Sequence, residues 1–243
     1  MRSLLRRVPQ QIPIETLATG LKRSRDPELL RNLVRFSFEK LGFFPKTATR
    51  MYEYPWAIVQ AGDVKNLRVL DVGAGVNALP LWFAEQRADV VTVDNHPVVR
   101  DTATRDRWNE WGYLDYSILD TRVFSVRSDV VDAPIEGPFD VIYSISVIEH
   151  VPAATRRKMI HRMAELSGPN CRLLLTLDLI PGTTRLWTFS EGQLVEDPAQ
   201  HGSLDDFLSE VVNEGFVIDD CTVASVIPDS RTDVAYIVAT RQL

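Results

Sequence analysis

Val69-Leu-Asp-Val-Gly-Ala-Gly-Val-Asn77 is the stretch of the chain that decides its fold. A short apolar run ends in Asp71, a tight turn with Gly73 and Gly75 follows, and helical spacing begins near Ala78. Strand, turn and helix in this order, with a carboxylate at the strand end, are typical of a nucleotide-type cofactor site. Glycine suits the turn because it tolerates positive φ and has no side chain to block a ligand. The stretch therefore predicts a cofactor without identifying it.

The composition limits the class of protein. The chain has 243 residues, 45% of them hydrophobic and 25% charged, which suits one α/β domain with additions. A net charge of -6 argues against a dedicated nucleic-acid binder. No apolar run reaches the length of a membrane span, and Pro9 and Pro13 interrupt any signal-peptide core. We expect a cytoplasmic protein with no nucleic-acid partner and no integral membrane segment.

Working outward from the glycine turn, strands and helices alternate. Strands are predicted near residues 67–71, 89–94, 122–126, 139–145 and 171–178, with helices near 78–87, 97–108 and 152–168. This alternation predicts a parallel sheet with helices on both faces. At the other end, the pattern predicts a helix from Ser203 and two strands, 216–227 and 233–240, joined as a hairpin through 228–232.

The chain is expected to divide into two parts. Residues 1–62 form an N-terminal arm and helical cap, with helices near 14–21 and after Asp26, and a short helix that follows residues 50–56. Residues 63–243 form the main domain. The connection 179–202 is long and holds several prolines and glycines, so we interpret it as an insertion on the substrate side.

Two cofactors compete for the glycine turn. Gly73-x-Gly75-x-x-Ala78 followed by Asp94 is compatible with the dinucleotide fingerprint, so an NAD-dependent oxidoreductase is an alternative. However, Asp71 would repel a pyrophosphate placed at the helix start and would stabilise a cationic ligand. Asp129, after the third strand, can accept a hydrogen bond from an adenine amino group. The chain also ends in a helix and a hairpin instead of another βα repeat.

Four motifs in the right order carry a family resemblance. They are Val69 to Gly75, Val91-Thr-Val-Asp94, Ser128-Asp129-Val130, and Phe139-Asp-Val-Ile-Tyr-Ser-Ile-Ser-Val-Ile-Glu-His150. Over about residues 50–241 the chain resembles the class I S-adenosylmethionine-dependent methyltransferases. The resemblance implies a three-layer, Rossmann-like α/β sandwich. Its seven-stranded sheet has the order 3-2-1-4-5-7-6, with strand 7 antiparallel.

This strand order also bears on the two cysteines. It places one strand between Cys171 and Cys221, so their strands would lie roughly 9–10 Å apart. A disulfide needs Cα atoms within about 7 Å, so both are expected to be free thiols.

The resemblance further implies a binding site for S-adenosylmethionine. Asp71 would orient the amino group, Asp94 would accept the ribose hydroxyls, and Asp129 with Val130 would hold the adenine. The other residues expected around the cofactor are Gly73, Ala74 and Gly75 of the turn, Asn95 and His96 near the adenosine, Ser144 through its carbonyl, and Arg50, Tyr52 and Tyr54 over the carboxylate. Capping or loop chemistry is the competing interpretation for Asn95, His96 and Arg50.

Methyl transfer to a hydroxyl needs a base near the ends of the fourth and fifth strands. His150, beside Glu149, is the first candidate, because a neutral imidazole at pH 7 can accept a proton. Packing at the start of the next helix is the competing interpretation. Asp178, at the end of the fifth strand, and His201, in the insertion, are the further candidates.

A narrower likeness concerns the methyl acceptor. Residues 51–56 and 177–206 resemble bacterial methyltransferases of sugar and polysaccharide synthesis, of the mycobacterial methylmannose polysaccharide 1-O-methyltransferase type. This favours O-methylation of a small molecule or a saccharide, with Tyr113, Tyr116 and Trp187 as candidate stacking residues or, alternatively, core residues. A phenol, lipid or amine acceptor, a non-enzymatic cofactor-binding role and a homodimer stay open. No cluster has metal-ligand spacing, although Asp178 and nearby acids would suit a divalent ion.

Overall fold

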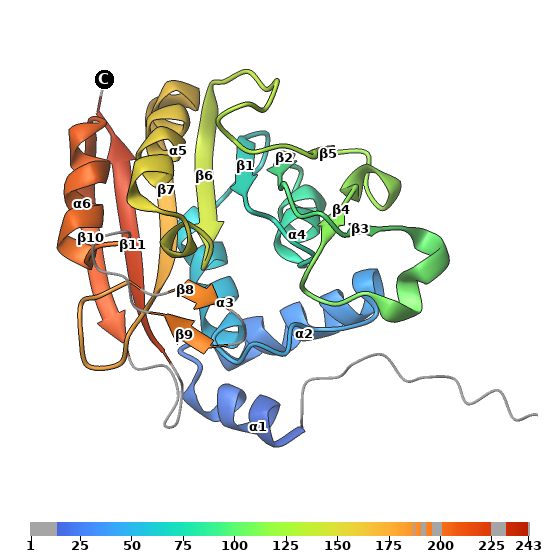
Figure 1. The fold of residues 1–243 in the computed structure, drawn as a ribbon. Coiled ribbons are helices and arrows are strands. Elements are labelled where there is room, and N and C mark those ends of the chain that lie inside the picture. The colour runs from blue at the N-terminus through green and yellow to red at the C-terminus, as the bar shows by residue number, and fades with distance from the viewer. Residues whose placement is uncertain (1–13, 187, 191–192, 196–200, 225–231, 243) are drawn as a thin grey trace, which may run out of the picture.

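The computed structural model describes residues 14–186, 188–190, 193–195, 201–224 and 232–242. A seven-stranded sheet forms the middle of the molecule (Figure 1). Its strands, in spatial order, are β10 (Phe216–Ala224), β11 (Asp233–Arg241), β7 (Ser167–Leu179), β6 (Phe139–Ile145), β1 (Arg68–Val72), β2 (Asp89–Val93) and β5 (Val123–Val126). In strand-number terms this is the predicted order 3-2-1-4-5-7-6.

The pairing directions agree with the prediction as well. β1 pairs in parallel with β2 and β6, β2 with β5, and β6 with β7, whereas β11 runs antiparallel to both of its neighbours. β11 separates the strands that carry Cys171 and Cys221, and both are free thiols. Because parallel strands end at one edge of the sheet, Asp71, Ser144 and Asp178 come to the same edge.

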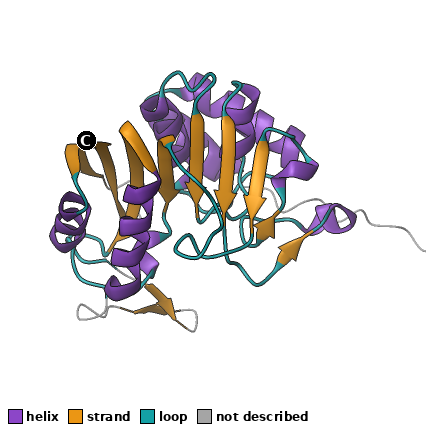
Figure 2. Ribbon diagram, turned by 90° about the horizontal axis from the view of Figure 1, so that it is seen from above, coloured by secondary structure: helices purple, strands orange, loops and turns teal. Residues whose placement is uncertain are grey.

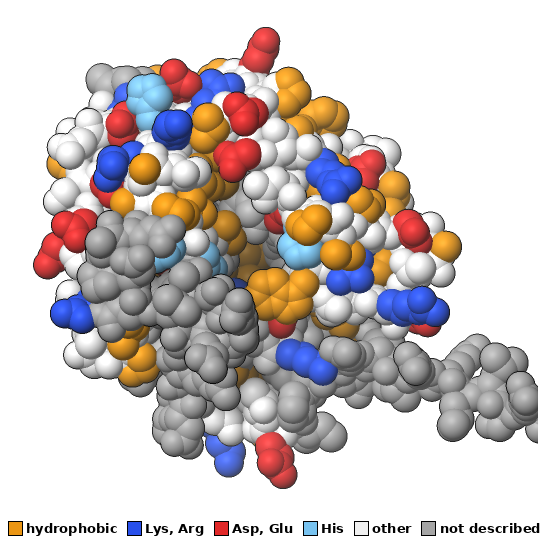
Figure 3. All heavy atoms as spheres, viewed as in Figure 1, with side chains coloured by type: hydrophobic (Ala, Val, Ile, Leu, Met, Phe, Trp, Pro, Cys, Tyr) orange, Lys and Arg blue, Asp and Glu red, His pale blue; other side chains and the backbone are white. Residues whose placement is uncertain are grey.

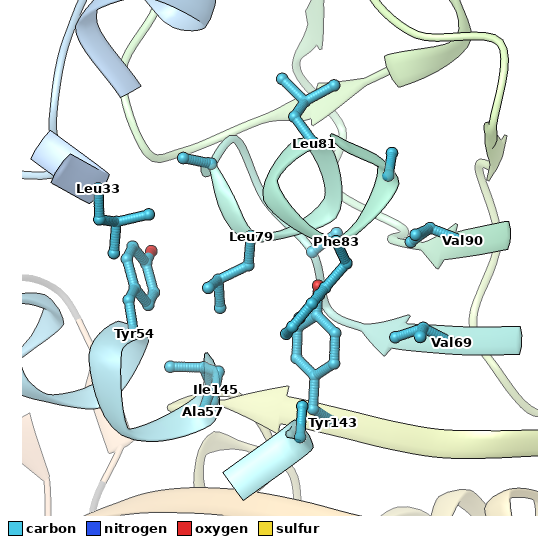
Figure 4. Packing of buried hydrophobic residues seen from close by; sticks show 14 of the residues in the cluster. Leu33, Tyr54, Ala57, Val69, Leu79, Leu81, Phe83, Val90, Tyr143 and Ile145 are labelled. Atoms are coloured by element: carbon cyan, nitrogen blue, oxygen red, sulfur yellow. The ribbon is translucent and has the colours of Figure 1, made fainter. Parts of the chain in front are cut away.

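Helices α2 (Pro27–Leu41), α3 (Arg50–Ala61) and α4 (Leu79–Glu85) cover one face of the sheet. Figure 4 shows Tyr54 and Ala57 of α3 packed near Leu79 and Ile145. The preceding helix α1 (Ile14–Arg23) contributes Leu17 and Leu21 to the edge of this cluster. The N-terminal helices therefore share one hydrophobic core with the sheet, and the division at residue 62 stays a prediction.

Helices α5 (Ala153–Leu166) and α6 (Leu204–Asn213) cover the opposite face, so helices lie on both sides of the strands (Figure 2). A capping box begins α6 at Ser203, where the sequence predicted the start of a helix. The Ser203 hydroxyl accepts from the Asp206 N–H, and the Asp206 carboxylate accepts from the Ser203 N–H. The helix predicted after Asp26 is α2, where the Asp26 side chain accepts from the Leu29 N–H and Gly42 ends the helix at φ 86°.

The predicted α-helix over residues 97–108 is wrong. The chain instead forms the short strand β3 (Val99–Arg100), the 3-10 helix η1 (Thr102–Arg107) and β4 (Tyr113–Leu114), before a second short turn, η2 (Tyr116–Ile118). Asp101 accepts from the Thr104 N–H and caps η1, so the helix begins five residues after Pro97. Residues 50–56, predicted to precede a short helix, are themselves the first half of α3.

The insertion after β7 contains a small hairpin, β8 (Thr188–Ser190) and β9 (Gln193–Val195), and β8 lies beside the short 3-10 helix at residues 148–150. Most of the predicted hairpin connection 228–232 and Trp187 fall outside the described residues. No described helix combines the length and apolar character needed to span a bilayer.

Candidate functional site

The glycine turn after β1 is packed against two other segments. Gly73 has φ 77°, and a Cβ there would lie 2.5 Å from Val147 Cγ1. Gly75 has φ 55°, and a Cβ there would lie 2.8 Å from the Glu110 carbonyl oxygen. Both glycines therefore serve close packing of the chain on itself, in addition to any approach by a ligand. The contact with Val147 brings the segment after β6 directly onto the turn.

Gly73→Ala is expected to lower the free energy of unfolding by about 1–2 kcal/mol for the left-handed backbone alone. A further loss is expected because Val147 must move away. Gly182→Ala is the matched control, since Gly182 has φ 73° and nothing within 4 Å of its added Cβ. Urea unfolding of both variants measures the difference. Equal losses would show that Val147 does not restrict the turn.

Asp71 is a buried carboxylate with an unsatisfied oxygen. Asp71 is 2% exposed, and its Oδ2 has no hydrogen-bond partner among the described residues. Burial raises the pKa of Asp71 to about 8. An unsatisfied buried oxygen at the end of β1 is the arrangement expected of a group that accepts a hydrogen bond from a ligand.

Asp71 makes stability depend on pH in a defined direction. Between the usual pKa of 3.8 and about 8, the folded protein keeps a proton that the unfolded chain releases. Stability is therefore expected to fall as pH rises through this range, by at most about 1.4 kcal/mol per pH unit from this group. Asp71→Asn removes this pH-dependent contribution. The difference in the free energy of unfolding between wild type and variant, measured by urea unfolding, should therefore change from pH 5 to pH 8. Parallel pH profiles would contradict the protonated state of Asp71.

The half-exposed Asp94 follows β2 and contacts the glycine turn. Its Oδ2 accepts from the Gly75 N–H at 2.7 Å, and its Oδ1 accepts from the His96 N–H at 2.6 Å. Asn95 is exposed, and the His96 Nδ1 accepts from the Val98 N–H at 3.1 Å, which is a local turn contact. Asp94 is thus fixed beside the turn, whereas His96 follows the loop interpretation.

On the far side of β2, Asp129 and Val130 follow β5. The Asp129 Oδ1 accepts from the Val131 N–H at 3.0 Å, and Val130 is 2% exposed in the core under α5. The carboxylate of Asp129 is half-buried and holds the turn that leaves the sheet.

Several predicted residues lie in the core. The Ser144 hydroxyl donates to the Val72 carbonyl at 2.8 Å. A contact between Ser144 and the cofactor would therefore use the backbone carbonyl, as expected from the family resemblance. Tyr54 is 4% exposed and packs edge-on against Phe44. Tyr116 is fully buried, and its hydroxyl accepts from the Asn77 N–H beneath the glycine turn. A role for Tyr116 in stacking on a sugar is therefore wrong, and the alternative core interpretation holds.

Sequence reasoning missed a buried polar network centred on Glu53 of α3. Glu53 is fully buried and forms an ion pair with Arg50. Its Oε1 accepts from the hydroxyls of Ser146 at 2.6 Å and Thr176 at 2.5 Å. Although burial opposes the charged form, Arg50 and these hydroxyls lower the pKa of Glu53. The network ties α3 to the ends of β6 and β7 and engages Arg50, which we expected over the cofactor.

One signal for this network was present in the sequence. Thr176 interrupts the apolar run of β7, and a polar residue in a buried strand requires a partner. Arg50 and Glu53 gave no such signal, because an acid and a base three residues apart also describe an exposed helix pair.

The fold joins three of the four predicted catalytic residues into one group, which we call the Glu149–His150–Asp178 cluster. Glu149 and His150 lie in the 3-10 helix η3 (Ile148–His150), and Asp178 lies near the end of β7. One ligand atom from each lies within 4.8 Å of the others. The Glu149 Oε1 accepts from the Asp178 N–H at 3.0 Å and lies 3.8 Å from the His150 Nε2.

Burial sets the charge state of this cluster. Glu149 is fully buried, Asp178 is 6% exposed, and the His150 side chain is 33% exposed. Burial raises the pKa of Glu149 to about 8, and burial together with the neighbouring Glu149 raises that of Asp178 to about 8. His150 is therefore the accessible member, and two carboxyl groups that resist ionisation lie behind it. Histidine side chains (pale blue) appear beside apolar ones near the centre of the face in Figure 3.

His201 does not join this group. It is 2% exposed, and its carbonyl accepts from the guanidinium of Arg156 at 2.7 Å. Arg156 is fully buried and also forms a two-point ion pair with Glu210 of α6. The backbone of His201 is thus held between α5 and α6. Two surface hollows of about 410 and 400 Å³ also lie along α5, and none of the candidate site residues lines them.

A family model described as a methyltransferase domain matches residues 22–209. No curated protein matches the chain.

Solved structures share the fold at low identity. A putative S-adenosylmethionine-dependent methyltransferase from Listeria monocytogenes is 14% identical with a TM-score of 0.56, covering 75% of this chain and 94% of its own. The Burkholderia thailandensis 1,6-didemethyltoxoflavin-N1-methyltransferase, with bound 1,6-didemethyltoxoflavin and S-adenosylhomocysteine, is 15% identical with a TM-score of 0.56, covering 90% and 80%. The magnesium protoporphyrin IX methyltransferase from Synechocystis PCC 6803, with bound S-adenosylmethionine, is 20% identical with a TM-score of 0.52, covering 78% and 76%.

Proposed function

Because the chain belongs to the methyltransferase-domain family, we propose that it transfers a methyl group from S-adenosylmethionine to a hydroxyl group of a small molecule. The observation that carries the hydroxyl assignment is the Glu149–His150–Asp178 cluster at the strand ends. A hydroxyl releases a proton when it is methylated, and this cluster can receive one.

The residues around the glycine turn fit the cofactor. The unsatisfied Oδ2 of Asp71 suits an ammonium group, and Asp94 keeps lone pairs free beside the turn for ribose hydroxyls. We assign Asp129 and Val130 to the adenine, and the backbone of Gly73, Ala74, Gly75 and Ser144 to the methionine part. When bound, the cofactor supplies an electrophilic sulfonium methyl group. Two similar structures that hold S-adenosylmethionine or S-adenosylhomocysteine support the assignment.

The chain's own groups prepare the acceptor. Val147 packs on Gly73, so His150, three residues later, is held near the turn. We propose that the His150 imidazole accepts the proton of the hydroxyl, because it is the half-exposed member of the cluster. Glu149 lies beside the ring, with its Oε1 3.8 Å from the His150 Nε2. Arg50 stays with Glu53, and Tyr54 packs beneath the site.

Two measurements test the function. Calorimetry with S-adenosylhomocysteine and with NAD distinguishes the cofactors, and we expect binding of the first only. Transfer of labelled methyl from S-adenosylmethionine is then screened against sugars, phenols, lipids and amines. Incorporation into a hydroxyl compound supports the proposal. Binding of NAD alone, or incorporation into amines alone, would overturn it.

Among hydroxyl compounds we place saccharides first, on the resemblance of residues 51–56 and 177–206. The burial of Tyr116 removes one of the stacking side chains that a sugar site would use. The screen therefore begins with saccharides and includes phenols as the second class of hydroxyl compound.

A further inference from the structure

The oxygen atoms of the Glu149–His150–Asp178 cluster are incompletely satisfied. Glu149 Oε2 and Asp178 Oδ1 have no hydrogen-bond partner among the described residues, although Glu149 is fully buried and Asp178 is 6% exposed. Buried polar atoms normally have a partner, and an exception calls for a bound group that completes the site. The two atoms belong to different elements, η3 and β7, which converge on one point.

The neighbouring charges do not complete the cluster. The buried carboxylate of Glu53, from α3, lies close enough to influence both Glu149 and Asp178 electrostatically. Arg50 also acts on both, but its guanidinium is engaged in the ion pair with Glu53. The guanidinium of Arg50 is therefore already paired with Glu53, so it does not neutralise Glu149 and Asp178 when these lose their protons, whereas a bound cation would.

His150 supplies a different kind of donor atom at the same point. Two carboxylate oxygens and one imidazole nitrogen, all within 4.8 Å of one another, form a mixed oxygen and nitrogen set. Atoms bound to one ion at about 2.0–2.2 Å lie within roughly 4.4 Å of one another, so small side-chain rotations suffice. Carboxylates suit Mn²⁺, imidazole suits Zn²⁺ and Fe²⁺, and the half-exposed His150 leaves a path for entry.

We propose that Glu149, His150 and Asp178 bind one divalent transition-metal ion. The site stands independently of the proposed function, since binding requires neither cofactor nor acceptor. With the ion bound, His150 is a ligand, and the ion makes a coordinated hydroxyl more acidic. In the ion-free protein, His150 remains the proton acceptor. This site revises the expectation from sequence spacing, because Glu149 and Asp178 are far apart in the chain.

Mn²⁺ titration of the full chain, followed by electron paramagnetic resonance, tests the site. We expect one bound Mn²⁺ per chain and a rise in the thermal midpoint on addition of Mn²⁺. Asp178→Asn and Glu149→Gln should each weaken binding at least about tenfold, because loss of groups that only orient a ligand already costs that much. Both variants replace a buried carboxyl group by an amide of similar shape, which carries no charge, so we expect them to fold. Circular dichroism verifies this.

Glu165→Gln is the matched control, because Glu165 is half-exposed on α5 and should leave Mn²⁺ binding unchanged. Absence of stoichiometric Mn²⁺ and Zn²⁺ binding to the wild type would overturn the site. So would equal affinity of the wild type and Asp178→Asn. Metal binding and methyl transfer are measured separately, so that the two proposals can fail separately: a wild type that transfers methyl to a hydroxyl but binds no metal rejects only the metal site, and one that binds metal but transfers methyl to no hydroxyl rejects only the proposed function.

Discussion

Replacement of Glu53 by alanine is expected to lower the free energy of unfolding by about 3–5 kcal/mol. The carboxylate accepts two hydroxyl hydrogen bonds and pairs with Arg50, whose side chain is 12% exposed. Its removal leaves the guanidinium without its partner and Ser146 and Thr176 without their acceptor. Urea unfolding at pH 7 measures the loss, and the affinity for S-adenosylhomocysteine should fall with it, because α3 loses its attachment to β6 and β7.

Two further variants test whether the unpaired charge of Arg50 causes the loss of stability in Glu53→Ala. The double variant Arg50→Met/Glu53→Leu removes both charges and should be more stable than Glu53→Ala, since no buried charge is left alone. Glu165→Ala breaks the exposed pair with Arg162 and should cost less than about 1 kcal/mol. A loss of that small size at Glu53 would mean that the network does not hold α3 in place.

His150→Ala is expected to lower kcat on a hydroxyl acceptor by about 10²–10⁴-fold without changing the affinity for S-adenosylhomocysteine. The imidazole is the accessible member of the cluster, with its side chain 33% exposed, and none of the residues that we assign to the cofactor is changed by the substitution. Single-turnover transfer of labelled methyl measures the chemical step, and calorimetry measures the binding.

His161→Ala is the control for the loss of an imidazole. His161 lies on α5 with its side chain 61% exposed and contacts Glu214, so its removal should leave kcat unchanged. Full turnover by His150→Ala with intact cofactor binding would show that another group, or none, receives the proton.

Much of the fold followed from local sequence patterns. Apolar strand runs and glycine turns predicted the strands. The family resemblance carried by four ordered motifs implied the sheet order, which the structure has as β5, β2, β1, β6, β7, β11 and β10. The error over residues 97–108 came from reading Pro97 as a helix start, whereas Asp101 caps a 3-10 helix that begins later. Caps decide such boundaries, and a proline alone does not.

The sequence by itself determined the individual strands, the glycine turn and the chemistry available at each strand end, because these depend on neighbours along the chain. Only the tertiary structure decided which of those groups meet. Glu53 reaches Ser146 and Thr176 across 93 and 123 residues, and Glu149 meets Asp178 across 29. Burial then changes what they do, since an acid that would be charged in water keeps its proton or requires a cation once the fold removes the water.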